Sequence, residues 1–497
     1  MRDVGPDSCI PSYDRKRVIA LIQYEGIKKA LGVDIAVSPE MAEAIYRWQR
    51  MYRNKPPWLS KDVRGLNLPA AISSEYARLV TNEVKIEVSG STRAAFINRL
   101  LEGFKGNLRK YVEFAGATGG ICFKPYPTGN TVAVDVVRAG NCYPTEFDSA
   151  GSMTGAIFPE FRRKGKKLYT RLEYHSLQRG RYIIVNRAFV STKAIIKTDE
   201  IVQLGMEIRL EDIDEWADIS PYEEFHNADC TLFSYLKIPM ANNIDPDSPL
   251  GVAVYSRSER QIQDADEVYG ATLWEYKSKE TAIQASNEYF KKNRQGDVLL
   301  PKGQERLYYP MGNGITDPAT GKPLFNVYSP DIRDQSFFNG YNRIIQKVEF
   351  NCGLAYGTLS DPQSVEKTAE EIKASRQRSY STVKDIQNST EEAIRSLVRS
   401  IEVWIDWGNL APPGKVEVSC DWDDSLIVDK KYELEQLRAD LAAGIIGPVE
   451  FRMKRFGETE EQAKEALEKI QFLKVDQGHI IDEAEGNGKL SLDRKNI

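Results

Sequence analysis

One long polar helix constrains this 497-residue chain more than any other feature. The stretch from Asp361 to Trp407 has Pro362 at its expected first turn and no later Gly or Pro, so we predict one uninterrupted helix. From Glu366 to Glu392 the side chains are mostly charged or hydroxyl-bearing. A helix that is polar nearly all round is expected to bridge solvent or to lie between subunits. The second half carries an ordinary buried stripe: Ile394, Leu397, Val398, Ile401, Trp404 and Ile405. This shape favours a part of an assembly over an enzyme.

Composition excludes several classes of protein. With 41% hydrophobic and 28% charged residues, the chain can bury real cores and is not expected to be disordered. It has no apolar run of about 18 residues, so we expect no membrane span. The short apolar run from Val18 to Ile22 is flanked by charges and does not indicate a signal peptide. The six cysteines are far apart, which is typical of reduced thiols in the cytosol: Cys9, Cys122, Cys142, Cys230, Cys352 and Cys420.

Negative charge is concentrated near the C-terminus. The formal net charge is −5, which argues against a wide basic surface that grips nucleic acid. Between Asp421 and Ile470 there are 8 Lys/Arg and 13 Asp/Glu, a surplus equal to the figure for the whole chain. The segment from Glu366 to Trp407 is balanced, with 7 against 8. We therefore expect a solvated acidic surface in the C-terminal part and a nearly neutral remainder.

The first 250 residues predict an α+β domain. Helical patterns cover Met41 to Asn82 and Thr92 to Phe114, with a strand from Val84 to Val88 between them. Further short strands are separated by Gly, Asn and Pro, as an antiparallel sheet requires. These strands are Ile121–Lys124, Val132–Val136, Ala156–Phe161, Leu168–His175 and Tyr182–Val185. A loop rich in Pro, Asn and Asp, Pro239 to Pro249, ends the domain.

Two helices that flank a turn-rich insert are predicted next. The first runs from Gly251 to Asn287 and the second from Asp334 to Phe350. Glycines 353 and 357 give the backbone freedom before the long helix. The insert is expected to contain three strands: Val298–Leu300, Arg306–Tyr309 and Leu324–Tyr328.

A small helical domain is predicted after Pro412–Gly414. Leu434, Leu437 and Leu441 form one stripe, which ends at Gly444. Thr459 and Gln462 have the spacing of a capping box, in which each side chain accepts a hydrogen bond from the other residue's backbone.

Histidines and glycines in this chain do not form a recognisable site. His175, His226 and His479 have no second ligand at metal-binding spacing, so we interpret them as structural. The glycines in Gly116–Gly120 precede a strand, where a nucleotide-binding loop requires a helix.

Acidic clusters are the other candidates for chemistry. The run Asn243–Asp247 lacks the sixth-position glycine of a calcium loop. We place Asp264 and Asp266 on a solvated helix face, and the group Asp421, Asp423 and Asp424 before a strand end. Without a converging partner neither group predicts catalysis. We therefore expect no catalytic residue, no metal and no cofactor.

Five segments in a fixed order resemble portal proteins of long-tailed bacteriophages and prophages of Gram-positive hosts. They are LNLPAAISSEYARLV (66–80), IPMANNIDPDSPLGVAVYSRSERQIQDADEVY (238–269), YNRIIQKVEFNCGL (341–354), VEKTAEEIKASRQRSYSTVKDIQ (365–387) and DLAAGIIGPVEFRMKRFGETEEQA (440–463). The likeness spans roughly Met41 to Ile470, and it leaves out Gly303–Arg333 and the tail after Leu473.

The resemblance implies an α+β, portal-like subunit with an α/β wing, a two-helix stem, a small β-containing clip, a long wing helix and a helical crown. The implied parts are the wing at 1–250, stem helices at 251–287 and 334–352 and the clip at 288–333. A tunnel loop at 353–367 precedes the long wing helix and return strand at 368–421, the crown at 422–473 and a flexible tail at 474–497.

The function that the resemblance implies is a homo-oligomeric ring, commonly a dodecamer, at one capsid vertex of a virion assembled in the host cytoplasm. Double-stranded DNA would pass through the channel during packaging and ejection. The implied partners are the terminase large subunit, the head–tail connector, and the major capsid and scaffolding proteins. The implied tunnel-loop residues are Gly353, Tyr356, Gly357, Leu359, Ser360, Gln363 and Lys367. The implied stem and subunit-interface residues are Ile262, Tyr269, Leu273, Tyr341 and Ile345.

Two other classes of function stay open on the sequence. One is a ring-forming adaptor of the head–tail junction through which no DNA is translocated, and which would not need the helix break at Gly353–Lys367. The other is an enzyme that uses paired carboxylates, which would require those carboxylates to converge in a pocket.

Overall fold

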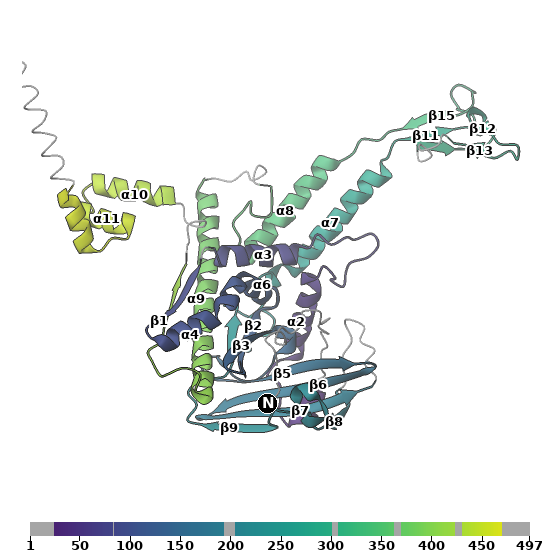
Figure 1. The fold of residues 1–497 in the computed structure, drawn as a ribbon. Helices are drawn as coiled ribbons and strands as arrows, with labels where there is room; N and C mark the ends of the chain where they lie inside the picture. Colours follow the sequence, from purple (N-terminus) through teal and green to yellow (C-terminus); the bar gives the residue numbers. More distant parts are fainter. Residues whose placement is uncertain are drawn as a thin grey trace, which may run out of the picture. The chain divides into compact units, whose positions relative to one another are not determined.

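The computed structural model describes residues 24–82, 84–192, 204–300, 307–361, 369–422 and 430–469. The chain divides into two compact units between residues 423 and 424, and each is described by itself. Figure 1 shows the elements, coloured along the sequence. Short 3-10 helices with described bounds occur among the longer elements: η1 (Ala139–Asn141), η2 (Leu210–Asp212), η3 (Asp214–Trp216), η4 (Ser256–Ser258) and η5 (Asn287–Tyr289).

Helices open the first unit. Ser38 caps α2, because its side-chain oxygen accepts the Met41 N–H at 3.3 Å. The helix predicted from Thr92 to Phe114 is instead three helices, because glycines at 103 and 106 lower helix propensity there. The six helices are α1 (Tyr24–Leu31), α2 (Pro39–Tyr52), α3 (Leu68–Val80), α4 (Thr92–Leu100), α5 (Glu102–Gly106) and α6 (Leu108–Thr118).

A six-stranded antiparallel sheet and a three-stranded one form the β part of this unit. The larger has the order β4-β5-β6-β7-β8, and β9 pairs with the same β7 edge as β8. Its strands are β4 (Tyr143–Phe147), β5 (Met153–Lys164), β6 (Lys167–Gln178), β7 (Arg181–Ser191), β8 (Met206–Ile208) and β9 (Tyr222–His226). The smaller, β10-β2-β3, contains β2 (Gly120–Thr128), β3 (Thr131–Arg138) and β10 (Ser234–Lys237). All five strands predicted between 121 and 185 are confirmed.

The long helix is α9 (Ala369–Gly408), and it packs against α3, β2 and β10. It leads to β16 (Glu417–Asp421), which pairs antiparallel with β1 (Lys85–Ser89). The predicted stripe in its second half is confirmed, since Ile394, Leu397 and Ile401 are fully buried.

The expectation that the polar first half of α9 bridges solvent is wrong, and its position between subunits stays a prediction. One face of this half is buried as well, and it carries Ser375, Ser379, Val383, Ile386 and Thr390. Small hydroxyl residues can be buried here because they satisfy their own hydrogen bonds. For example, the Thr390 hydroxyl donates to the Ile386 carbonyl at 2.7 Å. The buried stripe therefore continues along the helix under polar residue types.

Two helices, α7 (Glu259–Ser278) and α8 (Asp334–Cys352), pack side by side (Figure 1). The predicted helix from Gly251 to Asn287 was too long at both ends. Residues 251–255 are extended or turn, and Ala282–Ala285 forms strand β11. The insert holds a β14-β11-β15 sheet and a β12–β13 hairpin. Its other strands are β12 (Lys291–Lys292), β13 (Val298–Leu299), β14 (Tyr308–Pro310) and β15 (Phe325–Tyr328).

The second unit is helical. It contains α10 (Lys430–Ala442), α11 (Pro448–Phe456) and a helix over 460–469. The predicted capping box is confirmed, because Thr459 N–H donates to Gln462 Oε1 at 3.1 Å and Gln462 N–H donates to Thr459 Oγ1 at 3.4 Å. Gly444 ends the α10 segment with a φ of +70°, a conformation that glycine adopts without strain.

Candidate functional site

The segment that follows α8 is tied to one buried carboxylate. Glu349, on the last turn of α8, has an exposed fraction of 0%. Its Oε1 accepts the backbone N–H of Leu359 at 2.6 Å and that of Ser360 at 2.9 Å. Its Oε2 accepts the Ser360 hydroxyl at 2.9 Å and the Gly357 N–H at 3.3 Å. Four donors from one short loop therefore satisfy the carboxylate, which would otherwise be costly to bury.

The same loop is fastened to α9 and to an earlier turn of α8. Tyr356 N–H donates to Ser375 Oγ at 2.9 Å, and Asp361 N–H donates to Asn342 Oδ1 at 3.2 Å. The Arg378 guanidinium of α9 lies 4.4 Å from the Phe350 ring centroid and 5.6 Å from that of Tyr356. Residues 353–361 are therefore a packed connection between two helices.

The two glycines of this loop supply fixed turns. Gly353 caps α8 with a φ of +81°, and a side chain there would meet Thr382 Oγ1 at 2.9 Å. Gly357 has a φ of +83°, and its N–H is one of the four donors to Glu349. In the described segment, the two glycines are needed because the backbone there adopts the left-handed conformation, not because the loop must be flexible.

The predicted tunnel-loop residues fall into two groups. Gly353, Tyr356, Gly357 and Leu359 are half-buried, and Ser360 is buried. Gln363 and Lys367 lie outside the described residues.

Glu349, whose carboxylate binds this loop, was missed by the sequence reasoning. The sequence spacing could have identified it. Glu349 lies four residues after Ile345 and three before Cys352, which places an acidic side chain on the apolar face of the helix.

The predicted stem residues also fall into two groups. Ile262 and Ile345 are 1% and 0% exposed within this chain, so they pack inside the subunit and offer no surface to another copy. Tyr269, Leu273 and Tyr341 are half-buried. Burial raises the pKa of Tyr341 above its ordinary value, with further contributions from nearby Asp266 and Tyr269. A subunit contact through these three residues stays a prediction.

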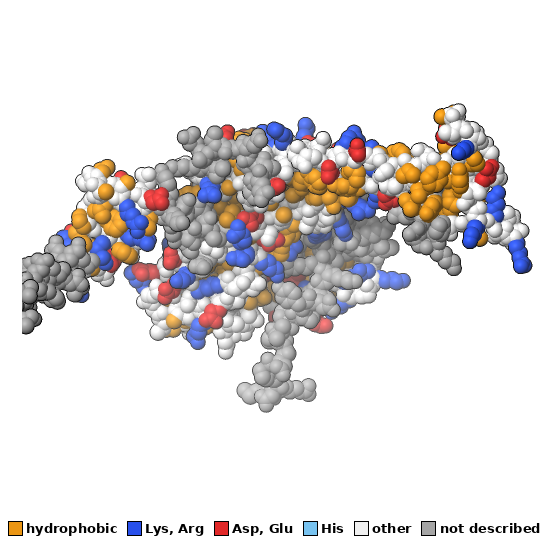
Figure 2. Space-filling view, turned by 90° about the horizontal axis from the view of Figure 1, so that it is seen from above, with side chains coloured by type: hydrophobic (Ala, Val, Ile, Leu, Met, Phe, Trp, Pro, Cys, Tyr) orange, Lys and Arg blue, Asp and Glu red, His pale blue; other side chains and the backbone are white. Residues whose placement is uncertain are grey.

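Large hydrophobic side chains on α7, α8 and the insert form a surface that the sequence reasoning did not identify. Trp274 is 68% exposed, Tyr309 is 64% and Phe338 is 49%. Figure 2 shows such side chains gathered over α8 and over the insert. We call this set the stem–insert surface: Trp274, Tyr276, Tyr289, Leu299, Tyr309, Ile315, Phe325, Val327, Tyr328, Ile332, Phe338 and Phe350. It holds 12 of the 19 large hydrophobic residues that are exposed in the described ranges, so the apolar exposure is local.

Asp266 does not lie on a solvated helix face as predicted. It is 3% exposed and accepts hydrogen bonds from Trp58 Nε1 at 2.9 Å and from the Leu66 N–H at 2.8 Å. Burial raises its pKa above the ordinary value. Its hydrogen bonds fasten the 58–66 segment to α7.

The other candidate acidic residues do not converge in the described structure. Asp264 is exposed, and Asp421, the last residue of β16, is exposed too. The other two acids of that group lie outside the described residues.

His175 is at the centre of a buried polar cluster in the large sheet. Its Nε2 lies 2.9 Å from Glu173 Oε1, and its Nδ1 lies 2.8 Å from the Tyr182 hydroxyl. Lys124 and Arg171 form ion pairs with Glu173. These contacts fit the structural interpretation of this histidine. His226 is exposed on β9, and His479 lies outside the described residues.

The Gly116–Gly120 segment supports close backbone packing. Ile238 N–H donates to the Gly119 carbonyl at 3.0 Å, and Val254 N–H donates to the Gly116 carbonyl at 2.9 Å. A side chain on Gly119 would collide with the Gly251 carbonyl oxygen at 2.2 Å. The glycines therefore let residues 251–254 approach α6, a structural reason for their presence.

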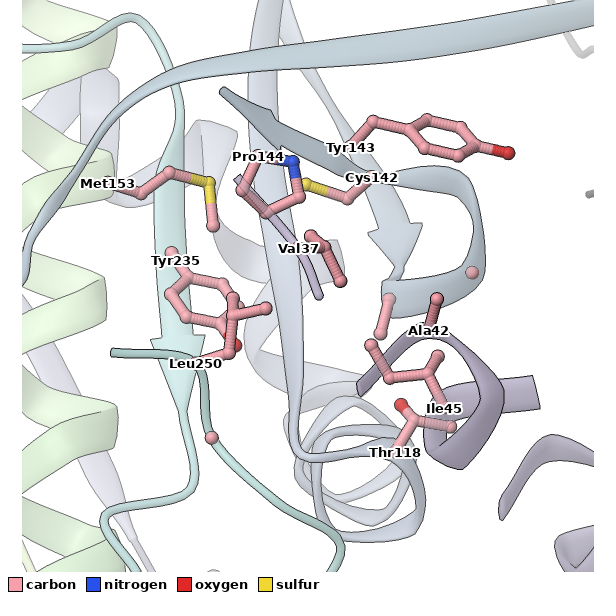
Figure 3. A pocket seen from close by; sticks show the side chains of 13 residues that line it. Val37, Ala42, Ile45, Thr118, Cys142, Tyr143, Pro144, Met153, Tyr235 and Leu250 are labelled. Carbon is pink, nitrogen blue, oxygen red and sulfur yellow. The ribbon is translucent and has the colours of Figure 1, made fainter. Parts of the chain in front are cut away.

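A small cavity lies beside this segment (Figure 3). Figure 3 shows Met153, Tyr235 and Leu250 around it, with Cys142 and Ile45 on other sides. Its lining residues include no acid, lysine, arginine or histidine. It does not supply the converging carboxylates that an enzyme of the predicted rival class would need.

Across the described ranges, no group of three or more His, Cys, Asp or Glu could hold a metal ion. Within those same residues, no helix is long and apolar enough to cross a membrane.

In comparison with known proteins, the C-terminal part of the chain is similar to one family. The family described as "Phage portal protein, SPP1 Gp6-like" matches residues 331–474, which include α8, the loop bound to Glu349, α9 and the described helices of the second unit. No curated protein matches the sequence. One solved structure that is similar is titled "Neck of native GTA particle computed with C12 symmetry". It has 13% identity and a TM-score of 0.38, over 86% of this chain and 97% of that chain. The family match confirms the resemblance predicted from the sequence, because residues 331–474 match the model of the phage portal protein family.

Proposed function

We propose that this chain is the subunit of a portal ring at one vertex of a phage-like particle, and that double-stranded DNA passes through the ring during packaging and ejection. The family match supports a structural role as a portal or connector. The ring, the channel, and the docking of the terminase and head–tail connector are the finer parts of the proposal. A dodecamer is the ring size that the resemblance implies.

The observation that carries the proposal is the stem–insert surface. Soluble monomers rarely expose a large apolar area, and one usually marks a protein contact. Here the exposed apolar side chains gather on two packed helices and the insert that joins them, while the described remainder of the first unit exposes only four large hydrophobic side chains: Tyr126, Met206, Tyr222 and Trp407. In a closed ring, one face of each subunit meets a different face of the next. The stem–insert surface is the face that most needs such a neighbour.

The charge distribution along the chain favours a channel through which DNA moves over a protein that binds DNA tightly. Each phosphate that a protein neutralises adds salt-sensitive affinity, and affinity of that kind would slow movement along the channel. The balanced charge of Glu366–Trp407 and the acidic surplus after Asp421 avoid such binding. We therefore expect DNA to bind the purified ring weakly, and more weakly still as salt is raised.

The test is the assembly state of the purified full chain. Light scattering should give the mass of a closed oligomer, and negative-stain images should show rings with an open centre. A ring with a closed centre would favour the adaptor of the head–tail junction instead. A compact monomer at micromolar concentration would overturn the proposal in both forms. Tight DNA binding at physiological salt would argue against the conduit and leave the ring unaffected.

A further inference from the structure

We propose that Glu349 is a positioning residue that holds residues 357–360 on α8, so that this part of the loop moves with the helix as one rigid piece. The inference rests on the proposed function in one respect, namely that this loop faces the DNA. It differs from the sequence-based expectation, in which the whole stretch from Gly353 to Lys367 follows the DNA freely. The anchor itself is a property of the subunit and can be measured without DNA.

The loop residues 357–360 are arranged around the carboxylate of Glu349, which lies on α8. Both carboxylate oxygens are used, and each accepts two hydrogen bonds from the loop. Three of the four donors are backbone N–H groups, so they fix the path of the chain irrespective of side chains. Hydrogen bonds to an ionised acceptor are stronger than neutral ones. Detaching the loop would break these four hydrogen bonds together, which opposes release.

The rest of the helix corner reinforces the anchor. Asn342 holds the Asp361 N–H two turns back along α8, so the loop is fastened to the same helix at both ends of the 357–361 stretch. Tyr76, on α3, donates its hydroxyl hydrogen to the Cys352 carbonyl at the end of α8. A tilt of α8 would therefore carry residues 357–360 with it. The position of this segment would be set by α8, not by independent motion of the loop.

The direct test replaces Glu349 with glutamine in the full chain. Glu349→Gln keeps the size and one acceptor oxygen, but its amide NH2 group faces N–H and O–H donors and cannot accept from them. Hydrogen exchange of the Leu359 and Ser360 amides should become about tenfold faster or more, while amides of the buried face of α9 keep their rates. Ser360→Ala removes one of the four donors from the loop side and should give a smaller increase at the same amides.

The matched control is Glu275→Gln. Glu275 is a carboxylate on α7 that accepts two hydrogen bonds from Arg333 at the far end of the helix pair. This variant should leave exchange at Leu359 and Ser360 unchanged. Unchanged exchange at those amides in a folded Glu349→Gln chain would overturn the anchor, as would an equal effect of the control. If Glu349→Gln does not fold, unchanged exchange in Ser360→Ala overturns it.

A measurement of DNA packaging separates this inference from the proposed function. Particles built with Glu349→Gln should assemble rings of wild-type mass but package several-fold less DNA than wild-type particles. A wild-type chain that forms no ring would refute the proposed function while the exchange result stands. Loosened amides with full packaging would refute the positioning role, even though the ring is confirmed.

Discussion

Arg333 and Glu275 form a paired ion contact that joins the two ends of the insert. Arg333 Nε donates to Glu275 Oε1 at 3.0 Å, and Nη2 donates to Oε2 at 2.9 Å. Glu275 lies near the end of α7, and Arg333 directly precedes α8. These hydrogen bonds lower the pKa of Glu275, so the pair persists at neutral pH. The contact closes the insert at its base, where 57 residues of intervening chain leave and return.

The first prediction concerns this closure. Arg333→Lys keeps the charge but cannot make two parallel hydrogen bonds, so the base of the insert should open more often. Limited proteolysis within residues 279–332 should become about threefold to tenfold faster. Lys277→Ala, an exposed change on the same turn of α7, is the control and should have no effect. Equal cleavage of the wild type and Arg333→Lys would show that the pair does not hold the insert.

A second prediction concerns pH and the buried His175. Burial lowers its pKa below the ordinary value, and the cations Lys124 and Arg171 also disfavour its charged form, although Glu173 opposes them. The unfolded chain therefore binds a proton at a higher pH than the folded one. Stability that is present above about pH 6.5 should be lost as the pH falls toward the folded-state pKa. Glu173 stays ionised across this window, because its own pKa is held well below the ordinary value.

The measurement for His175 is the urea midpoint at about pH 7.5 and about pH 5.5. The wild type should lose up to about 1.4 kcal/mol per pH unit through this one group. His175→Gln should show a smaller difference between the two pH values, because glutamine does not titrate. His226→Gln on β9, whose side chain is 73% exposed, serves as the control. If all three proteins shift equally, His175 is not the group that titrates.

Sequence reasoning was most successful where periodicity alone sets the structure. Strands β5 and β6 of the large sheet and helix α8 were predicted within a few residues, and the capping box of Thr459 and Gln462 was predicted from its spacing, whereas β4, β8 and β9 were missed. It failed on the first half of α9, because Ser375, Ser379 and Thr390 are polar residue types that lie on the buried face of the helix. A hydroxyl that donates a hydrogen bond to a carbonyl of its own helix, as Thr390 does, is less costly to bury, and a hydropathy scale does not include this effect.

The candidate site was only partly predictable for a related reason. The break after α8 could be predicted from Gly353 and Gly357, but glycine marks both flexible segments and fixed left-handed turns. Which of these applies depends on donors and acceptors brought together in space, such as Glu349 with Leu359 and Ser360. The same limit explains Asp266, whose partners Trp58 and Leu66 lie about 200 residues away in sequence.

A third prediction concerns Arg93, which fastens the end of α9 to α4. It is 5% exposed, donates to the Pro412 carbonyl at 3.0 Å and the Ala411 carbonyl at 3.1 Å, and pairs with Asp406 at 2.6 Å. Arg93→Ala leaves these acceptors without their donor and should destabilise the chain by about 2–4 kcal/mol in urea unfolding. Arg99→Ala, an exposed change on α4, should cost under about 0.5 kcal/mol. A similar small loss for both would mean that water replaces the Arg93 contacts.

The last prediction concerns the stem–insert surface. Tyr269 and Leu273, the interface residues predicted from sequence, are half-buried, so polar substitutions there would disturb the fold as well as any contact. Trp274 and Phe338 are exposed, and replacing both with serine should leave the subunit folded. Such truncations at a packed contact each cost about 2 kcal/mol or more, which should lower the oligomer mass in light scattering while circular dichroism stays unchanged.

Met206→Ser provides the matched control for this surface. Met206 is a large hydrophobic residue on β8 that is 70% exposed but lies outside the stem–insert surface. If simple loss of exposed apolar area weakened assembly, this variant would also reduce the oligomer mass. We expect it to assemble like the wild type, because the contact depends on where the apolar side chains lie and not on their number. A Trp274→Ser, Phe338→Ser chain that keeps the wild-type oligomer mass would move the subunit contact away from this surface.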